Sequence, residues 1–287
     1  MPMPPIELPD AVLSALAAPG EPEHGVVAAN GIPFATRSWG DPDQPPLLLV
    51  HGVTASSRVW WRLGPALAVG LERRVVAVDQ AGHGRTVVWV GHHRFADNAA
   101  DLVAFARAAG LDRPDLRVVG HSWGGMTSAA LPVAGIRPAT LVLLDPPAIP
   151  FAYISQMVSD PSEVSYPDLD TAIRELARLN PSWPPEDVRA KAEALTELEI
   201  EAARAVLLEN GDWDGGLGDI SDPAADRIPI WLIRGDPATG GLMPDAALPG
   251  FAARIGEDHI VTLAGSPHAP QRTHPVETTA SLLRALG

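Results

Sequence analysis

The sequence predicts a doubly wound, mostly parallel α/β sheet with a helical segment inserted between two of its strands. Short, near-continuous Val/Leu/Ile runs, each ended by Gly, Asp or Pro, alternate with helix-length amphipathic segments. Such runs are typical of strands that are buried on both faces of a parallel sheet. Their alternation with helices indicates right-handed crossovers, and ligand sites in such sheets lie at the carboxyl ends of the strands.

Six runs are predicted to be strands of this sheet: Pro46–His51, Arg74–Asp79, Leu116–Gly120, Thr140–Asp145, Ile228–Gly235 and Asp258–Leu263. Gly25–Asn30 and Ile32–Trp39 are joined across Asn30-Gly31 and predict an antiparallel hairpin that feeds the sheet. Four helices are expected between or after the runs: Trp60–Val69, Asp97–Ala109, Ser122–Val133 and Val276–Ala285. The first 25 residues are interpreted as a Pro-rich arm.

One interval interrupts the alternation. Residues 147–226 contain no convincing strand, only helix-like stretches such as Leu169–Leu179 and Pro185–Leu208. Because 80 residues are too many for a plain connection, we interpret the interval as a helical cap. The predicted organisation is a core made of residues 1–146 and 227–287 with a cap insertion at 147–226.

Composition excludes several classes of function. The chain has 287 residues, of which 46 % are hydrophobic, and it has no cysteine, so disulfides, a cysteine nucleophile and thiolate metal sites are ruled out. The net charge of −14 disfavours nucleic acid and anionic lipid as partners. No apolar run is long enough for a membrane span, and the N-terminus makes a poor signal peptide, so we expect a cytoplasmic protein. The oligomeric state is left open.

The most informative motif is Gly120-x-Ser122-x-Gly124, which directly follows a predicted strand and precedes a predicted helix. A nucleophile on a sharp strand-to-helix turn needs small neighbours, and the turn directs the hydroxyl into the cleft. The pattern alone is common, but its strand-turn-helix context is specific. Ser122 is therefore the candidate nucleophile.

Here the sequence resembles the α/β-hydrolase superfamily, from about Gly25 to the end. His51-Gly52 is similar to the family's HG motif, and Asp79–Thr86 is similar to its D-x-x-G-H-G-x-S turn, with Thr in place of the last Ser. The inserted segment matches the family's cap. The resemblance implies an oxyanion hole formed by the backbone N–H groups of Val53 and Trp123.

A serine nucleophile needs a base, and the resemblance implies the order Ser, acid, His. Three histidines in the last third of the chain are candidates. His268 stands seven residues before Pro275, which is the family's spacing, and is the favoured base. His274 is the alternative, while His259 lies inside a predicted strand.

Two aspartates end strands that follow the nucleophile. Asp236 ends the run WLIRGD, at the place where the family carries its acid. Asp145 ends LVLLD one strand earlier, which some relatives use, although a turn or helix cap before two prolines would explain it as well. Asp236 is the favoured acid.

The expected activity is hydrolysis of a carboxylic ester or lactone of medium size and largely apolar character through an acyl-enzyme. Tyr153, Met157, Trp183 and Trp213 are the candidate pocket residues of the cap. Relatives that open epoxides generally carry Asp at the nucleophile position, so Ser122 disfavours that chemistry. Amide or carbon–carbon hydrolysis, perhydrolysis, acyl transfer to another acceptor, and a slowly hydrolysing ligand receptor remain alternatives.

No cofactor or metal is expected. The sequence has no phosphate-cradling Gly loop and no dinucleotide fingerprint, and His92-His93 lack a third ligand at a sensible spacing. The expected partner is a small-molecule substrate.

Overall fold

The structure, a computed structural model, describes residues 7–87, 91, 93–158 and 166–287. Its centre is an eight-stranded sheet in the order β1-β2-β4-β3-β5-β6-β9-β10. The strands are β1 (Glu23–Ala29), β2 (Ile32–Trp39), β3 (Pro46–Val50), β4 (Arg74–Val78), β5 (Arg117–His121), β6 (Thr140–Leu144), β9 (Ile230–Arg234) and β10 (Ile260–Thr262). The pairs β1–β2 and β2–β4 are antiparallel, and every pair from β4 to β10 is parallel. The predicted sheet and hairpin are confirmed.

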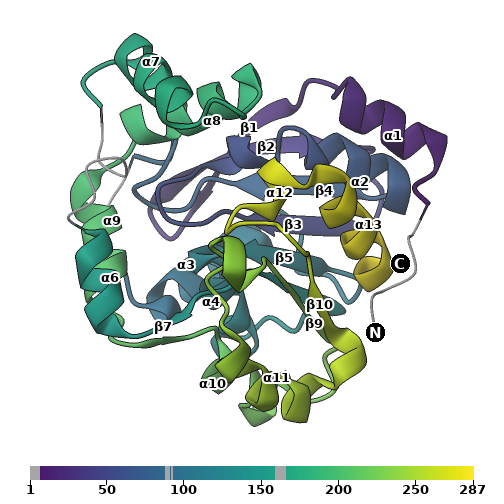
Figure 1. Ribbon diagram of the computed structural model, residues 1–287. Helices are drawn as coiled ribbons and strands as arrows, with labels where there is room; N and C mark the ends of the chain where they lie inside the picture. The colour runs from purple at the N-terminus through teal and green to yellow at the C-terminus, as the bar shows by residue number, and fades with distance from the viewer. Residues whose placement is uncertain (1–6, 88–90, 92, 159–165) are drawn as a thin grey trace.

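Alternate side chains of the strands enter two separate cores, as the two-residue period of a strand requires. Leu47 and Leu49 of β3 pack on one face with helices α1 (Asp10–Ala17), α2 (Leu63–Leu71) and α13 (Pro275–Leu286). Leu48 and Val50 pack on the other face with helices α3 (Phe95–Ala108), α5 (Leu131–Ala134) and α11 (Leu248–Ile255). Figure 1 shows α1, α2 and α13 together on one side of the sheet. The doubly wound class is therefore confirmed.

Between β6 and β9 the chain forms helices and adds no strand to the large sheet. The helices are α6 (Phe151–Met157), α7 (Leu169–Leu179), α8 (Pro185–Thr196), α9 (Ile200–Leu208) and α10 (Leu217–Ile220). The first four of them lie along one edge of the molecule in Figure 1, and we call these four the cap helices. Two short strands, β7 (Ala148–Ile149) before the cap helices and β8 (Trp213–Asp214) after them, pair with each other.

Four details differ from the sequence-based expectation. The expected helix Ser122–Val133 is two helices, which cover residues 123–129 and 131–134. The predicted N-terminal arm contains helix α1, because Val12 and Leu16 recur at helical spacing and are buried against α2 and α13. The stretch 185–208 is two helices, α8 and α9, with a break at 197–199. The pair β7–β8 lies in an interval where no strand was expected.

The remaining elements are short. They comprise helices α4 (Trp123–Ala129) and α12 (Pro270–Thr273) and the 3-10 helices η1 (Ser57–Trp60), η3 (Pro223–Ala225), η4 (Pro237–Thr239), η5 (Asp245–Ala247) and η6 (Glu257–His259). Within the described residues, none of the helices combines the length and the apolar character that crossing a membrane requires.

Candidate active site

Ser122 lies between the end of β5 and the first residue of α4, in a strained backbone conformation with φ 56° and ψ −127°. The glycines on either side are needed for space. A Cβ on Gly120 would lie 2.2 Å from the carbonyl oxygen of Gly124, and one on Gly124 would lie 2.4 Å from that of His51. Real Cβ atoms do not approach so closely, so this strand-turn-helix geometry excludes side chains at both positions.

A continuous chain of hydrogen bonds runs from Ser122 through His268 to Asp145. Nε2 of His268 is 2.9 Å from Oγ of Ser122, and Nδ1 of His268 is 2.7 Å from Oδ2 of Asp145. Asp145 is fully buried and also accepts hydrogen bonds from the N–H groups of Gly235 and Leu242. A carboxylate held in this way fixes the ring orientation of the histidine and places its other nitrogen at the serine.

The expectation that Asp236 orients His268 is wrong, because Asp145 occupies that position at the imidazole. The carboxylate of Asp236 accepts hydrogen bonds from the N–H groups of Ala238 and Gly265, and these bonds lower its pKa. Asp236 therefore stabilises the loop that leads to His268 without contacting the imidazole. Asp145 takes this place because its backbone, directly after β6, is left-handed with φ 43°, and its side chain contacts His268.

The two rival histidines lie elsewhere. His259 stacks on Trp231 and contacts the carbonyl oxygen of Ile230. His274 precedes α13, and its Nδ1 contacts the hydroxyl of Thr273. Among the three candidate bases, His268 alone has a hydrogen bond to Ser122 within the described residues.

The two expected oxyanion donors flank the nucleophile. Trp123 is the first residue of α4, and Val53 follows Gly52 in the turn after β3. A Cβ on Gly52 would lie 2.8 Å from Cβ of Ser122, so this backbone passes directly beside the serine. In the part of the chain that the structure describes, neither N–H donates to another protein group.

Sequence reasoning missed the support that buried histidines give to the site. His121 donates from Nε2 to the carbonyl oxygen of His268 at 2.8 Å, and its Nδ1 accepts from the side-chain amide of Gln271. His51 donates to the carbonyl oxygen of Gly52 and accepts from the N–H of Gln80. These partners require neutral rings. The sequence did carry a signal, because His51 is the first residue of the His51-Gly52 motif and His121 directly precedes Ser122.

Burial keeps these rings neutral. Desolvation lowers the pKa of His51 to about 4 and the pKa values of His83 and His121 to about 3. The ring of His83 packs 4.9 Å from that of Trp123. His83 lies in the turn after β4, within the motif at 79–86, and is fully buried.

A cavity of about 560 Å³ opens over Ser122 and His268. Apolar side chains of residues 147–226 form part of its wall, and all four residues expected to line a pocket, Tyr153, Met157, Trp183 and Trp213, do line it. Lys191 and Arg272 also line it, and the sequence analysis did not single them out. Arg272 lies over the ring of Trp183 at 4.1 Å.

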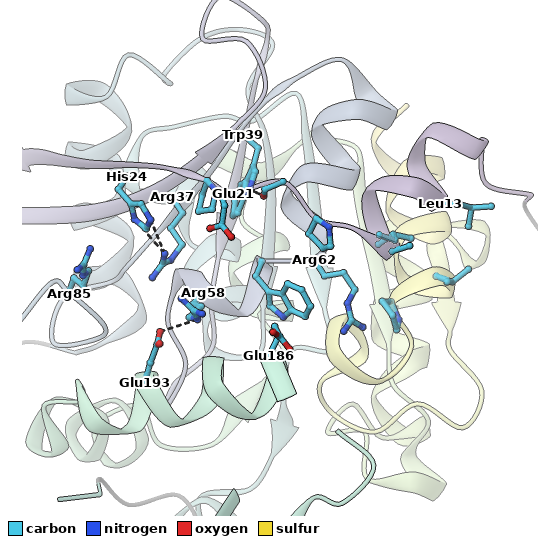
Figure 2. A pocket seen from close by; sticks show the side chains of 18 of the residues that line it. Leu13, Glu21, His24, Arg37, Trp39, Arg58, Arg62, Arg85, Glu186 and Glu193 are labelled. Carbon is cyan, nitrogen blue, oxygen red and sulfur yellow. Dashed lines mark hydrogen bonds and ion pairs between the residues drawn. The ribbon is translucent and has the colours of Figure 1, made fainter. Parts of the chain in front are cut away.

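A larger cavity of about 1050 Å³ lies elsewhere, between the first hairpin and α8. Figure 2 shows its charged lining, in which Arg37, Arg58, Arg62 and Arg85 alternate with Glu21, Glu186 and Glu193. Neither Ser122 nor His268 borders it. We therefore take the smaller cavity as the candidate active site, because it contains the hydrogen-bonded serine and histidine.

The described residues contain no group of three or more side chains placed to hold a metal ion. His93 is buried, and His92 lies outside the described residues.

Comparison with known proteins agrees with the fold and the motifs. A family model described as alpha/beta hydrolase family matches residues 47–282. The chain belongs to the alpha/beta hydrolase family. It is a hydrolase whose motifs at 51–52, 79–86 and 120–124 lie inside the matched region.

Some relatives of this alpha/beta hydrolase carry esterase or lipase names, and others are named epoxide hydrolases. Lipase LipV of Mycobacterium tuberculosis is 28 % identical over 274 residues, covering 89 % of this chain and 98 % of the relative. A pimeloyl-(acyl-carrier protein) methyl ester esterase of Aromatoleum aromaticum is 28 % identical, covering 81 % and 94 %. The solved structure of E-2-(acetamidomethylene)succinate hydrolase superposes with a TM-score of 0.76 at 22 % identity, covering 92 % and 98 %. At that identity the superposition shows the fold alone.

Proposed function

We propose that this hydrolase cleaves a carboxylic ester or lactone through an acyl-enzyme on Ser122. The observation that carries the proposal is the chain of hydrogen bonds from Ser122 through His268 to buried Asp145. In the proposed first step, His268 takes the proton of the Ser122 hydroxyl as the oxygen attacks the carbonyl carbon. The alcohol leaves with that proton, and water activated by His268 releases the acid.

The proposed oxyanion hole consists of the N–H groups of Val53 and Trp123. Both residues flank Ser122, and both N–H groups have no protein acceptor in the described chain. Removing one such donor typically costs a factor of about 10² to 10³ in turnover.

The character of the substrate is inferred from the cavity. A volume of about 560 Å³ suits a molecule of medium size, and the side chains of Tyr153, Met157 and Trp213 offer it an apolar wall. The names of two relatives, a lipase and a methyl ester esterase, support ester hydrolysis.

The test is steady-state hydrolysis of p-nitrophenyl esters from acetate to decanoate, together with simple lactones. We expect turnover with an optimum at medium chain length, a loss of at least about 10⁴-fold in Ser122→Ala, and labelling of Ser122 by a fluorophosphonate. Turnover that survives in Ser122→Ala would refute the serine mechanism. A folded wild-type protein that is labelled but hydrolyses no ester or lactone would move the assignment to amide, carbon–carbon or acyl-transfer chemistry.

A further inference from the structure

The turn after β3 holds a β-branched residue in a left-handed conformation. Thr54 has φ 57° and is buried. The carbonyl oxygen of Gly52 accepts a hydrogen bond from the N–H of Ala55 at 3.2 Å, so residues 52–55 form a β-turn with Thr54 in third place. A positive φ at that place is the mark of a type II turn, which usually carries Gly or Asn there. Because threonine disfavours this conformation, neighbouring groups must hold it.

The only lysine of the chain contacts this residue. Lys191 lies on cap helix α8, is 8 % exposed, and is 137 residues away from Thr54 in sequence. Its Nζ donates to Oγ1 of Thr54 at 2.8 Å and to the carbonyl oxygen of Thr54 at 3.2 Å. A cation that binds the backbone and the side chain of one residue restricts both the peptide plane and the rotamer. Lysine is rarely buried without such hydrogen bonds.

Thr54 directly follows Val53, whose N–H is the proposed oxyanion donor. Relaxation of Thr54 to a negative φ would convert the turn to type I, which rotates the peptide plane between Val53 and Thr54. The N–H of Val53 belongs to the preceding peptide plane, so that rotation reaches it through the backbone of Val53. Oxyanion donors act only when they lie about 2.7–3.1 Å from the developing charge, so even a small shift of this N–H matters. The side chain of Val53 also packs against the apolar cluster of the cap that includes Leu176, Val188 and Leu195.

We propose that Lys191 is a positioning residue that holds Thr54 in its left-handed conformation. Through this contact, helix α8 keeps the N–H of Val53 in place as one of the two oxyanion donors. This inference rests on the proposed function. It differs from a general role of Lys191 in attaching the cap, because α8 has other contacts with the core.

Helix α8 also contacts residues 58–62, which follow the turn at 52–55. Arg58 pairs with Glu193 at 3.0 Å, a contact drawn as a dashed line in Figure 2. Asp187 accepts from the indole N–H of Trp61 at 3.0 Å and pairs with Arg62 at 3.3 Å. Loss of the Lys191 ammonium therefore leaves α8 docked. Glu193→Gln is a matched control, because it removes the charge from a contact between α8 and the core that does not involve Thr54.

The experiment measures kcat and KM for a p-nitrophenyl ester in the wild type, Lys191→Met and Glu193→Gln, with folding checked by circular dichroism. We expect Lys191→Met to lower kcat by at least about 10-fold, less than the loss of a whole donor, with KM within about threefold. The affinity for a trifluoromethyl ketone should fall by the same factor as kcat/KM. Glu193→Gln should stay within about twofold of the wild type.

Substitutions at Thr54 distinguish the effect of its backbone conformation from the effect of the Lys191 charge. Asn accepts a left-handed backbone more readily than Thr, so Thr54→Asn should recover most of the kcat lost in Lys191→Met. Should Lys191→Met fail to fold, Thr54→Val and Thr54→Asn can be compared with the lysine present. Val keeps the β-branch but lacks the hydroxyl, so only Thr54→Val should lose kcat.

Three results would overturn the inference: an unchanged kcat in Lys191→Met, equal losses in Lys191→Met and Glu193→Gln, or equal kcat values in Thr54→Val and Thr54→Asn. Failure of the proposed function gives a different result. In that case the wild type itself would neither hydrolyse the ester nor react with a fluorophosphonate.

Discussion

The carboxylate of Asp145 lies 2.7 Å from Nδ1 of His268, although the two residues are 123 positions apart in the sequence. Asp145 directly follows β6 and His268 follows β10, and only β9 lies between these two strands in the sheet. The carboxyl ends of parallel strands share one edge, so the loop after β10 can reach across β9 to the acid. Asp236, at the end of β9 itself, is nearer in sequence and binds that loop's backbone instead.

The two aspartates should respond differently to the same substitution. Asp145→Asn should lower kcat by about 10³ to 10⁴, because an amide no longer fixes the productive tautomer of His268. Asp236→Asn should keep kcat within about 10-fold, because it weakens only hydrogen bonds to Ala238 and Gly265. Steady-state hydrolysis of one ester by both variants checks this. Equal losses in the two would remove Asp145 from its assigned role.

The buried histidines should make the fold sensitive to acid. In the unfolded chain a histidine takes up a proton below pH 6.5, whereas His51, His83 and His121 stay neutral in the folded chain down to about pH 4, 3 and 3. The unfolded state therefore binds more protons, and the free energy of unfolding should fall between pH 6.5 and 4.5. Each histidine contributes at most about 1.4 kcal/mol per pH unit. Urea titrations across this range measure the slope.

Replacing His83 tests how much one buried histidine contributes to that pH dependence. We choose His83 because its Nε2 is buried without a hydrogen-bond partner within the described residues. His83→Gln should lower the dependence of the free energy of unfolding on pH by the contribution of one proton, at most about 1.4 kcal/mol per pH unit. An unchanged slope in this variant would mean that His83 already takes up its proton in the folded state.

Asp219 should affect the pH dependence of stability in the direction opposite to that of the buried histidines. Burial and the nearby carboxylate of Asp214 raise its pKa to about 6, so the folded chain holds this proton more tightly than the unfolded chain does. Stability is therefore lost as the pH rises from about 4 to 6. Asp219→Asn should stabilise the protein at pH 7.5 by up to about 1 kcal/mol after solvent screening, with little change at pH 4. Thermal unfolding at the two pH values distinguishes this from a stabilisation that is independent of pH.

Side chains at the glycines beside Ser122 should not be tolerated. A Cβ on Gly124 would overlap the carbonyl oxygens of Val50 and His51, which are backbone atoms and cannot move aside. We expect Gly124→Ala to destabilise the fold by at least about 2 kcal/mol and to abolish hydrolysis. Gly211→Ala is a suitable comparison, since nothing lies within 4 Å of its added Cβ, although φ there is positive. Equal melting temperatures in the two variants would contradict the steric argument.

The sequence was informative wherever burial on both faces of the sheet left a continuous apolar pattern. Strands such as β3 and β5 were predicted for this reason, whereas the turn that holds Ser122 was predicted from its glycine spacing. The acid was not, because Asp145 and Asp236 both end apolar strands and the left-handed backbone of Asp145 leaves no pattern in the sequence. Contacts such as that of His121 with His268 join segments 147 residues apart, which only the folded chain brings together.

The close packing around Gly52, Gly120 and Gly124 has a consequence for how such an enzyme changes during evolution. A Cβ on Gly120 or Gly124 would overlap backbone atoms, and a Cβ on Gly52 would overlap the side chain of Ser122, so these three positions do not accept a side chain. The opposite wall is formed by side chains such as Tyr153, Met157 and Trp183, whose segment adds no strand to the sheet. Selection for a new substrate would therefore accumulate changes in the cap, and laboratory libraries restricted to these positions should yield more active clones than libraries spread over the whole chain.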